Sequence, residues 1–347
     1  MKRTWLILLA KLAITGALLA WVLSRTDLAA VGAQLRGARR LWVLLALLLW
    51  AGNIFVGTFR WRLVLRALGV RFPIGRALQL CWSAQFFNTF LPSGVVGDAL
   101  RSAWTARGAD PLRAVASVVL DRVCACIALA IAVGVGLMLP VARALPGRPG
   151  LLIAAAILGA VASALLAFPY ALAHIAARIL GPRLERLLRG HLATPVGAMP
   201  RLVAVALALV TQALLIATVV ALAHGATVSL SLAASIAVVP AVMATAYVPI
   251  SISGIGLREV ALVALLRQVG VPAGGALAIS ILLVAVTWAV SLLGGLVYLM
   301  SRHGLGPTPT GASRLEAPTS PRTIELDGSA VHDGFAVDSR GSPRPRP

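Results

Sequence analysis

Charged residues are scarce in this chain, and acidic residues are the scarcest of them. Only 12% of the 347 residues are charged, with 11 Asp and Glu against 31 Lys and Arg. A soluble domain has about 25% charged and about 45–50% apolar residues, whereas 59% are apolar here. Alternating strands of the kind that build outer-membrane barrels are also missing. The composition therefore predicts an all-α polytopic membrane protein.

Residues that hold metals, cofactors or nucleic acid are equally sparse. The three cysteines, Cys81, Cys124 and Cys126, lie in apolar segments, and the five histidines are scattered without metal-ligand spacing. No Walker phosphate loop is present. The basic residues lie in short clusters between apolar runs, as is typical of membrane-flanking positions. We therefore expect no metal, no cofactor and no nucleic-acid partner.

Long apolar runs occupy most of the chain. Several have about the 20 residues that a bilayer crossing needs. A strongly basic loop, residues 60–76, follows the second run, and residues 301–347 have the composition of a disordered tail. The predicted full spans number about six and cover residues 1–23, 41–59, 114–139, 151–173, 201–223 and 276–300.

The distribution of Lys and Arg predicts an orientation. With the N-terminus in the cytoplasm, most basic residues outside the spans fall on the cytoplasmic side. The four basic residues between Arg25 and Arg40 run against this bias. We expect a multi-pass protein of the inner (plasma) membrane, with the N-terminus and the C-terminal tail both cytoplasmic.

Two apolar segments are interrupted by helix-breaking residues in the same pattern. Each reads aromatic-x-Pro-x4-Gly-x3-Arg and ends at Arg101 or Arg258. Freed backbone groups are tolerated at membrane depth only inside protein or beside a water-filled cavity. Paired interruptions in two halves favour a transporter-type binding site. The residues expected at these breaks are Pro92, Gly94, Gly97, Pro249, Gly254 and Gly256.

Spacing along the chain predicts an inverted repeat. Pro92 and Pro249 are 157 residues apart, and the spans that begin at residues 41 and 201 are offset by 160. The spans that begin at residues 114 and 276 are offset by 162. An odd number of spans separates the two motifs, so the motifs face opposite sides. We expect one transmembrane domain, residues 1–300, with halves of about 1–139 and 151–300 that each contain a re-entrant helical hairpin.

A few polar residues in these apolar segments are candidates for a substrate site. Arginine binds phosphate bidentately and keeps its charge, so two arginines near open helix ends suit the phosphate of a lipid. Interfacial snorkelling, structural ion pairs and ties between helices are the alternatives for the same residues. The candidate substrate-binding residues are Asn88, Asp98, Arg101, Asp121, Arg122, Arg258 and Glu259. Asp121 with Arg101 is the ion pair that we expect across helices.

These motifs resemble a known family. The segments Asn88–Arg101, Asp121–Arg122 and Pro249–Glu259 are similar to those of the lysylphosphatidylglycerol synthase transmembrane-region family, also called flippase-like membrane proteins. The resemblance covers nearly all of residues 1–300. It implies a domain that translocates a lipid, and not the cytosolic synthase domain to which some members of the family are fused.

The function expected from the sequence is translocation of an anionic phospholipid or a lipid-linked precursor. One alternative is a membrane-embedded transferase that acts on polyprenyl-phosphate substrates, with Asp98 or Asp121 as acid or base. Another is a non-catalytic scaffold for a lipid or glycan enzyme. Membrane lipids are the expected partners, and a lipid- or glycan-modifying enzyme and self-association into a homo-oligomer are left open.

Overall fold

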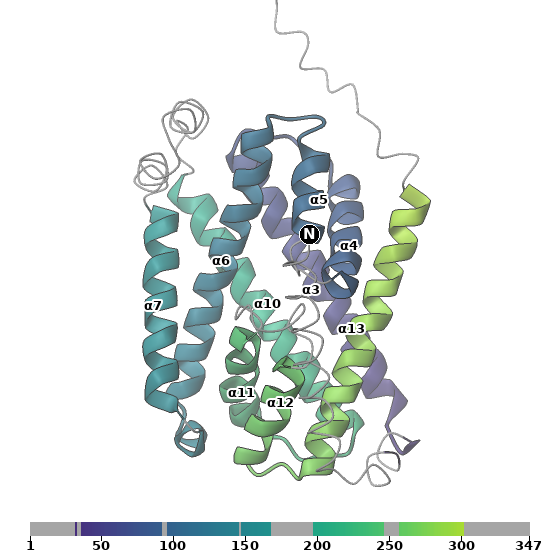
Figure 1. The fold of residues 1–347 in the computed structure, drawn as a ribbon, viewed down its shortest axis with the longest axis vertical. Helices are drawn as coiled ribbons and strands as arrows, with labels where there is room; N and C mark the ends of the chain where they lie inside the picture. Colours follow the sequence, from purple (N-terminus) through teal and green to yellow (C-terminus); the bar gives the residue numbers. More distant parts are fainter. Residues whose placement is uncertain are drawn as a thin grey trace, which may run out of the picture. The chain divides into compact units, whose positions relative to one another are not determined.

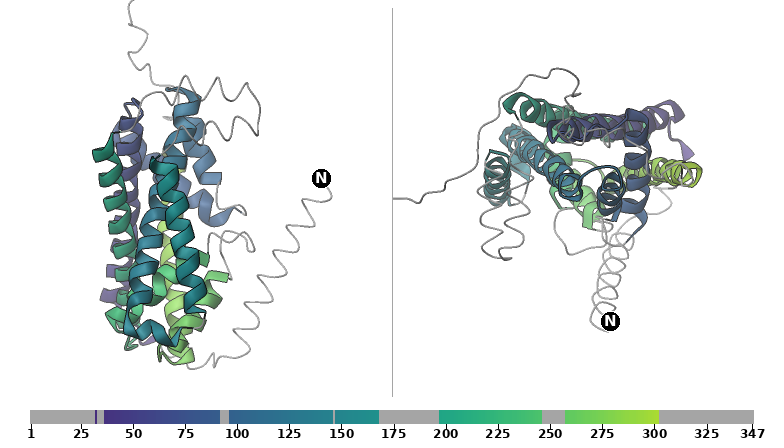
Figure 2. Two further views of the ribbon diagram at one scale, coloured as in Figure 1. Left: turned by 90° about the vertical axis from the view of Figure 1, so that its left-hand side faces the viewer. Right: turned by 90° about the horizontal axis from the view of Figure 1, so that it is seen from above.

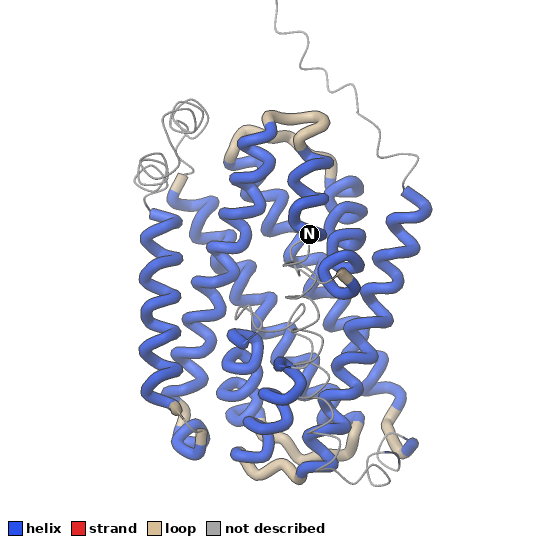
Figure 3. The backbone as a smooth tube through the Cα atoms, viewed as in Figure 1, coloured by secondary structure: helices blue, strands red, loops and turns tan. Residues whose placement is uncertain are grey.

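The computed structural model describes residue 32 and residues 36–91, 96–145, 147–167, 197–245 and 257–301. Every regular element within these ranges is a helix (Figure 3). Helix α7 packs on α6, and the other long helices pack around α3 and α10 (Figure 1). The elements are α3 (Arg40–Ala67), α4 (Ile74–Phe90), α5 (Val96–Thr105), α6 (Pro111–Met138), a 3₁₀ turn η1 (Pro140–Ala144), α7 (Arg148–Ala167), α10 (Ala198–Gly225), α11 (Leu232–Thr245), α12 (Leu257–Gln268) and α13 (Ala273–Ser301).

Five of the described helices, α3, α6, α7, α10 and α13, are long and apolar enough to cross a membrane. Many of their large apolar side chains face outward; Leu41 and Leu48 of α3 are 80% and 70% exposed. Such exposure suits a hydrocarbon solvent and confirms the helical membrane class. The expected first span, residues 1–23, lies outside the described residues, and so does the expected tail apart from Ser301.

The prediction of a basic loop at residues 60–76 is wrong for residues 60–67. Helix α3 continues to Ala67 and carries Arg60 inside the bundle. It ends where Gly69 adopts a left-handed φ of 77°. The Gly69 N–H then donates to Arg66 O and the Val70 N–H to Leu65 O, both at 2.9 Å. A left-handed glycine with these two hydrogen bonds is a common end of an α-helix. The helix therefore ends at the glycine and not at the first basic residue.

Two pairs of short helices alternate with the long ones. Helix α4 ends at Phe90 because Leu91 is extended, and α5 runs back along α4. Gly97 is the second residue of α5 and lies against Ala84, so it does not break the helix as expected. A Cβ atom at Gly97 would collide with the Ala84 carbonyl oxygen, which explains the glycine. The other expected break residues, Pro92, Gly94, Pro249, Gly254 and Gly256, lie outside the described residues.

The order of elements in the first half recurs in the second. Helices α3 and α10 have 28 residues each, α4 and α11 have 17 and 14, α5 and α12 have 10 and 12, and α6 and α13 have 28 and 29. Corresponding helices start 158, 158, 161 and 162 residues apart (40 to 198, 74 to 232, 96 to 257 and 111 to 273). The similar lengths and offsets support two related halves.

Helices α3 and α10 lie side by side and antiparallel (Figure 2). The Arg39 N–H at the start of α3 donates to Gly225 O at the end of α10, at 2.9 Å. At the middle of both helices, Asn53 Nδ2 donates to Thr211 O at 2.8 Å, and these two residues are 158 positions apart. Corresponding helices that meet at their midpoints in opposite directions are what an inverted repeat requires.

Each half also packs a short helix against a long helix of the other half. Helix α4 packs on α13, and its counterpart α11 packs on α6. Each contact uses a glycine: a Cβ atom at Gly136 would collide with Ile236 O, and one at Gly294 would collide with Trp82 O. Gly136 and Gly294 are themselves 158 residues apart. The short helices therefore approach the long helices of the opposite half backbone to backbone.

We expect Gly136→Ala to destabilise the protein by about 1–3 kcal/mol, the usual cost of an overpacked contact, because the backbone of α11 blocks the added methyl group. Gly134→Ala is the matched control on the same helix, since open space surrounds that position. It should leave stability unchanged or raise it by up to about 1 kcal/mol through helix propensity. Thermal unfolding of the detergent-solubilised variants measures both, and equal effects would contradict the close packing of α6 on α11.

Candidate functional site

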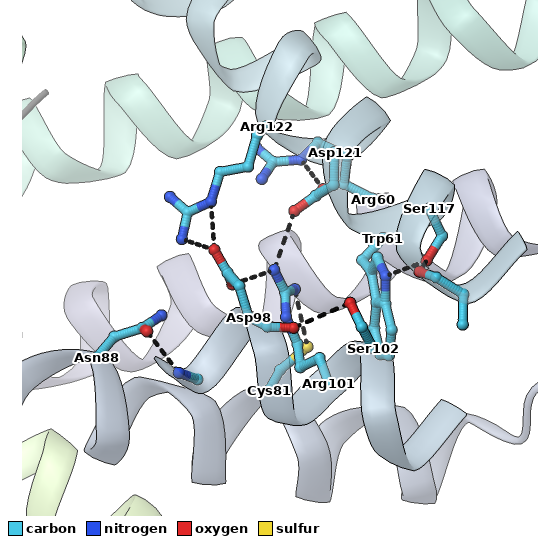
Figure 4. A network of polar contacts seen from close by, with 12 residues as sticks. Arg60, Trp61, Cys81, Asn88, Asp98, Arg101, Ser102, Ser117, Asp121 and Arg122 are labelled. Carbon is cyan, nitrogen blue, oxygen red and sulfur yellow. Dashed lines mark hydrogen bonds and ion pairs between the residues drawn. The ribbon is translucent and has the colours of Figure 1, made fainter. Parts of the chain in front are cut away.

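Five charged side chains meet where α3, α5 and α6 come together (Figure 4). We call them the charge cluster: Arg60 of α3, Asp98 and Arg101 of α5, and Asp121 and Arg122 of α6. Arg60 and Asp121 lie about 10 Å and 15 Å from the nearest ends of their helices, at 1.5 Å per residue. Because these helices are about 42 Å long and the hydrocarbon core is about 30 Å thick, helices centred in a membrane would place the two residues about 4 Å and about 9 Å inside the hydrocarbon.

Each carboxylate oxygen in the charge cluster faces a guanidinium group. Asp121 Oδ1 accepts from Arg60 Nε at 2.7 Å, and Asp121 Oδ2 lies 3.7 Å from Arg101 Nη2. Asp98 Oδ1 accepts from Arg101 Nη2 at 2.6 Å, and Asp98 Oδ2 accepts from Arg122 Nε at 2.6 Å and also pairs with Arg122 Nη2. The expected contact between Asp121 and Arg101 is present. Arg101 bridges the two carboxylates.

The charge cluster carries one positive charge more than its carboxylates balance, since it has three arginines and two aspartates. The side chains of Arg60, Arg101, Asp98 and Asp121 are at most 10% exposed. Arg122 differs, because 44% of its side chain is exposed. Excess charge next to hydrocarbon is costly unless a counter-charge is supplied. The chemistry of the cluster suits a bound anion that approaches from the side of Arg122.

Neighbouring groups fix Arg101. Its guanidinium lies 5.0 Å from the ring centroid of Trp61, and its Nη1 points at Cys81 Sγ, 3.8 Å away. Trp61 is held in turn by a 3.1 Å hydrogen bond from its Nε1 to Ser117 Oγ. The Nε of Arg101 is buried, and no described group accepts a hydrogen bond from it. Buried donors are almost always paired, so this N–H group is a donor that an incoming acceptor would satisfy.

The start of helix α6 is fixed locally by its own sequence. Asp110 caps it by accepting from the N–H groups of Leu112 and Arg113, at 2.8 and 3.2 Å, and Pro111 occupies the first helical position. Such a cap satisfies N–H groups that the first turn leaves free. It sets the register that brings Asp121 and Arg122, 11 and 12 residues after the cap, to the charge cluster.

Asn88 serves the hairpin of α4 and α5. Its Oδ1 accepts from the Gly97 N–H at 2.8 Å, so one N–H group at the start of α5 is already bonded. Gln85 and Thr89 of the same helix contact Ser291 of α13, at 3.3 and 2.8 Å, and tie the two halves together. The described contacts of Asn88 and Gln85 are those of ties between helices, one of the roles expected for polar residues in these apolar segments.

Arg258 and Glu259 are not brought into the charge cluster. They lie at the start of α12, and Arg258 donates to Glu259 Oε1 from its Nε at 3.1 Å and its Nη2 at 2.8 Å. Arg258 and Arg101 therefore bind different carboxylates on different helices. A single chamber shared by these two arginines has no support among the described contacts.

Sequence reasoning missed two members of this region, Arg60 and Trp61. It assigned them to a loop because a basic run follows them. The signal that identifies them is the helical spacing of Trp61, Val64, Leu65 and Leu68, which are all buried. The arrangement of three guanidinium groups around two buried carboxylates forms only when the three helices pack together.

The spanning helices and the buried charge cluster define the class: a polytopic α-helical membrane protein with ionisable groups inside its bundle. Within that class, residues 8–295 match the model of the lysylphosphatidylglycerol synthase TM region, and the chain belongs to this family. The match confirms the resemblance found in the motifs. None of the curated proteins matches the chain.

The charge cluster predicts a strong coupling between Arg60 and Asp121. We expect Asp121→Leu or Arg60→Met alone to destabilise the protein by about 3–5 kcal/mol, because each leaves a buried charge without its partner. The double variant should cost less than the sum of the two. Free energies of unfolding in mild detergent, measured for the unchanged protein, both single variants and the double variant, give the coupling energy of this double-mutant cycle. Arg66→Leu on the exposed face of α3 is the control and should change little; additive effects would contradict a direct buried pair.

Proposed function

We propose that this protein is a flippase-like lipid translocase that moves an anionic phospholipid or a lipid-linked precursor across the membrane. The charge cluster would receive the phosphate of the lipid. The observation that carries the proposal is the excess positive charge of a buried cluster that is exposed only at Arg122. Family membership supports the location in the membrane, and the geometry supports the anion.

A phosphate would complete the bonding of the charge cluster. Arg122 has the most exposed side chain of the cluster, and Arg101 Nε has no hydrogen-bond partner among the described residues. Arginine holds phosphate through two parallel N–H bonds and stays charged at every physiological pH. The aspartates would then set the charge balance, because they hold Arg60, Arg101 and Arg122 in place.

The short hairpins support a path for the headgroup. Helices α4 and α5, with 17 and 10 residues, fall short of a crossing, and so do α11 and α12 with 14 and 12. We interpret each pair as a re-entrant hairpin that enters from one side of the membrane, with the two halves related by inversion. Rocking of one packed group of helices against another would carry the headgroup past the interrupted helices.

The expected orientation forms part of this proposal. If the N-terminus is cytoplasmic and one span precedes α3, helix α3 ends on the cytoplasmic side of the inner membrane. The charge cluster, near that end, would then accept lipids from the cytoplasmic leaflet. Basic residues between the spans follow the same bias.

A transferase is the weaker alternative. A catalytic acid or base needs a carboxylate that reaches the reacting group. All four oxygens of Asp98 and Asp121 instead face arginines, at 2.6–3.7 Å for the pairs with Arg60 and Arg101. The described geometry therefore gives these carboxylates a charge-balancing role. A scaffold without transport would tolerate neutral residues in their place.

Arg122→Gln should lower the rate of phosphatidylglycerol translocation at least tenfold, which corresponds to about 1.4 kcal/mol, because it removes the exposed cation of the charge cluster. The assay uses the full chain in vesicles that contain headgroup-labelled phosphatidylglycerol, with a membrane-impermeant quencher to report the outer leaflet. Arg122→Lys should recover only part of the rate, since lysine lacks the two-pronged geometry.

Arg107→Gln is the matched control, because Arg107 is exposed and lies outside the charge cluster. Its transport rate should equal that of the unchanged protein. Lipid extracted after the assay should keep its mass, whereas a new mass would indicate a transferase. Equal rates for Arg122→Gln and Arg107→Gln, or no transport above protein-free vesicles, would overturn the proposal.

A further inference from the structure

A second feature lies at the opposite end of α3 from the charge cluster. It is an open groove of about 660 Å³ between α3, α6, α10 and α11. Its walls are almost entirely apolar, and they include Leu49 of α3, Ile131 and Val135 of α6, and Ile216 of α10. Trp42 in the groove is 18 residues from Arg60, or about 27 Å along the helix at 1.5 Å per residue. The groove is thus separate from the charge cluster.

The length of the groove matches one leaflet. Its wall on α10 extends from Leu209 to Ala221, about 18 Å along the helix axis. Half of the hydrocarbon core is about 15 Å thick. A membrane-spanning helix from another protein would need the whole height of the bundle, whereas one hydrocarbon chain of a lipid fits this depth. The volume falls within the range of about 300–1,000 Å³ that ligand pockets occupy.

The outer end of the groove carries the groups of a membrane interface. Trp42 lines it and stacks on His224, with ring centroids 4.7 Å apart. Aromatic rings of this kind gather at headgroup level. Arg39 and Arg40, just before Trp42, are both exposed. The groove is therefore apolar along its length and ends beside two cations. An anionic phospholipid has the complementary arrangement, an apolar chain that ends at a negatively charged headgroup.

One polar side chain, Gln212, interrupts the apolar lining midway along α10. Its Oε1 is buried without a hydrogen-bond partner among the described residues. Polar side chains at membrane depth either tie helices together or mark functional positions. Gln212 gives the groove wall a feature that an ordinary lipid-facing surface lacks.

We propose that this groove binds one acyl chain of an anionic phospholipid, with the lipid phosphate beside Arg39 and Arg40. The site lies in the leaflet opposite the charge cluster. It requires binding only, and does not rest on transport. The lipid is recognised by its chain along α3 and α10 and by the charge of its headgroup.

Photolabelling tests this site with the full chain in nanodiscs. The probes are phosphatidylglycerol and phosphatidylcholine that carry the same diazirine at the end of one chain, and mass spectrometry locates the labelled peptides. Peptides of α3 and α10 that line the groove should be labelled at least threefold more by the phosphatidylglycerol probe. Uniform labelling of exposed helix faces, or equal labelling by both probes, would overturn the proposal.

Filling the groove provides a second test. Ala217→Phe on α10 and Ala132→Phe on α6 place a ring inside it and should each reduce the labelling at least fivefold. Ala156→Phe adds the same ring on the exposed face of α7 and should have no effect. Arg122→Gln should leave the labelling unchanged, which separates this site from translocation. Unchanged labelling in the filled variants would refute the acyl-chain site. So would cross-links at Gln212→Cys between two copies of the chain in place of lipid labelling. If a variant fails to fold, the labelling pattern of the unchanged protein still tests the site.

Discussion

The arrangement of helices α3, α5 and α6 depends on ion pairs at the edge of the hydrocarbon. Arg101 reaches Asp98 at 2.6 Å and Asp121 at 3.7 Å, and Arg60 holds the other oxygen of Asp121 at 2.7 Å. Water screens these charges weakly at such burial, so each group depends on its partners more than it would on a surface. The pairs join α3 to α5 and α6, which follow each other in the sequence. Any movement of α5 relative to α3 and α6 must break or exchange these contacts, and this makes the cluster sensitive to a bound anion.

The rest of the bundle limits how such a movement can occur. Helices α3 and α10 are joined at their midpoints by the bond from Asn53 to Thr211 and at one end by the bond from Arg39 to Gly225. The short helices α4 and α11 pack closely on α13 and α6 through glycine contacts. Packed interfaces of this kind move as units rather than deform. The packed units that result, α4 with α13 and α11 with α6, each combine helices of both halves, so a rigid-body movement would carry each unit as a whole.

Charge is distributed unequally between these similar halves. Counted by the motif that ends at Arg101 and Arg258, an offset of 157, the arginine recurs, while Asp98 corresponds to Ile255 (98 + 157). Arg60 and Asp121 correspond to Thr218 and Leu283, by the offsets of their own helices, 158 and 162. The second half therefore keeps the backbone arrangement and replaces most of the charges with apolar or hydroxyl side chains. A site for an anionic headgroup on one side and an apolar groove on the other agree with this asymmetry.

The sequence by itself determined the membrane class, five of the spanning helices and the family, because hydrocarbon demands long apolar helices whatever their partners are. It also predicted the contact between Asp121 and Arg101. Tertiary structure alone decided that Arg60 joins them and that Asn88 bonds to the start of α5. Arg258 pairs with Glu259, one of the ion pairs that the sequence left as an alternative. The physical reason is that hydropathy acts on each segment separately, whereas the partner of a buried charge depends on the register and rotation of helices that meet only in the folded bundle.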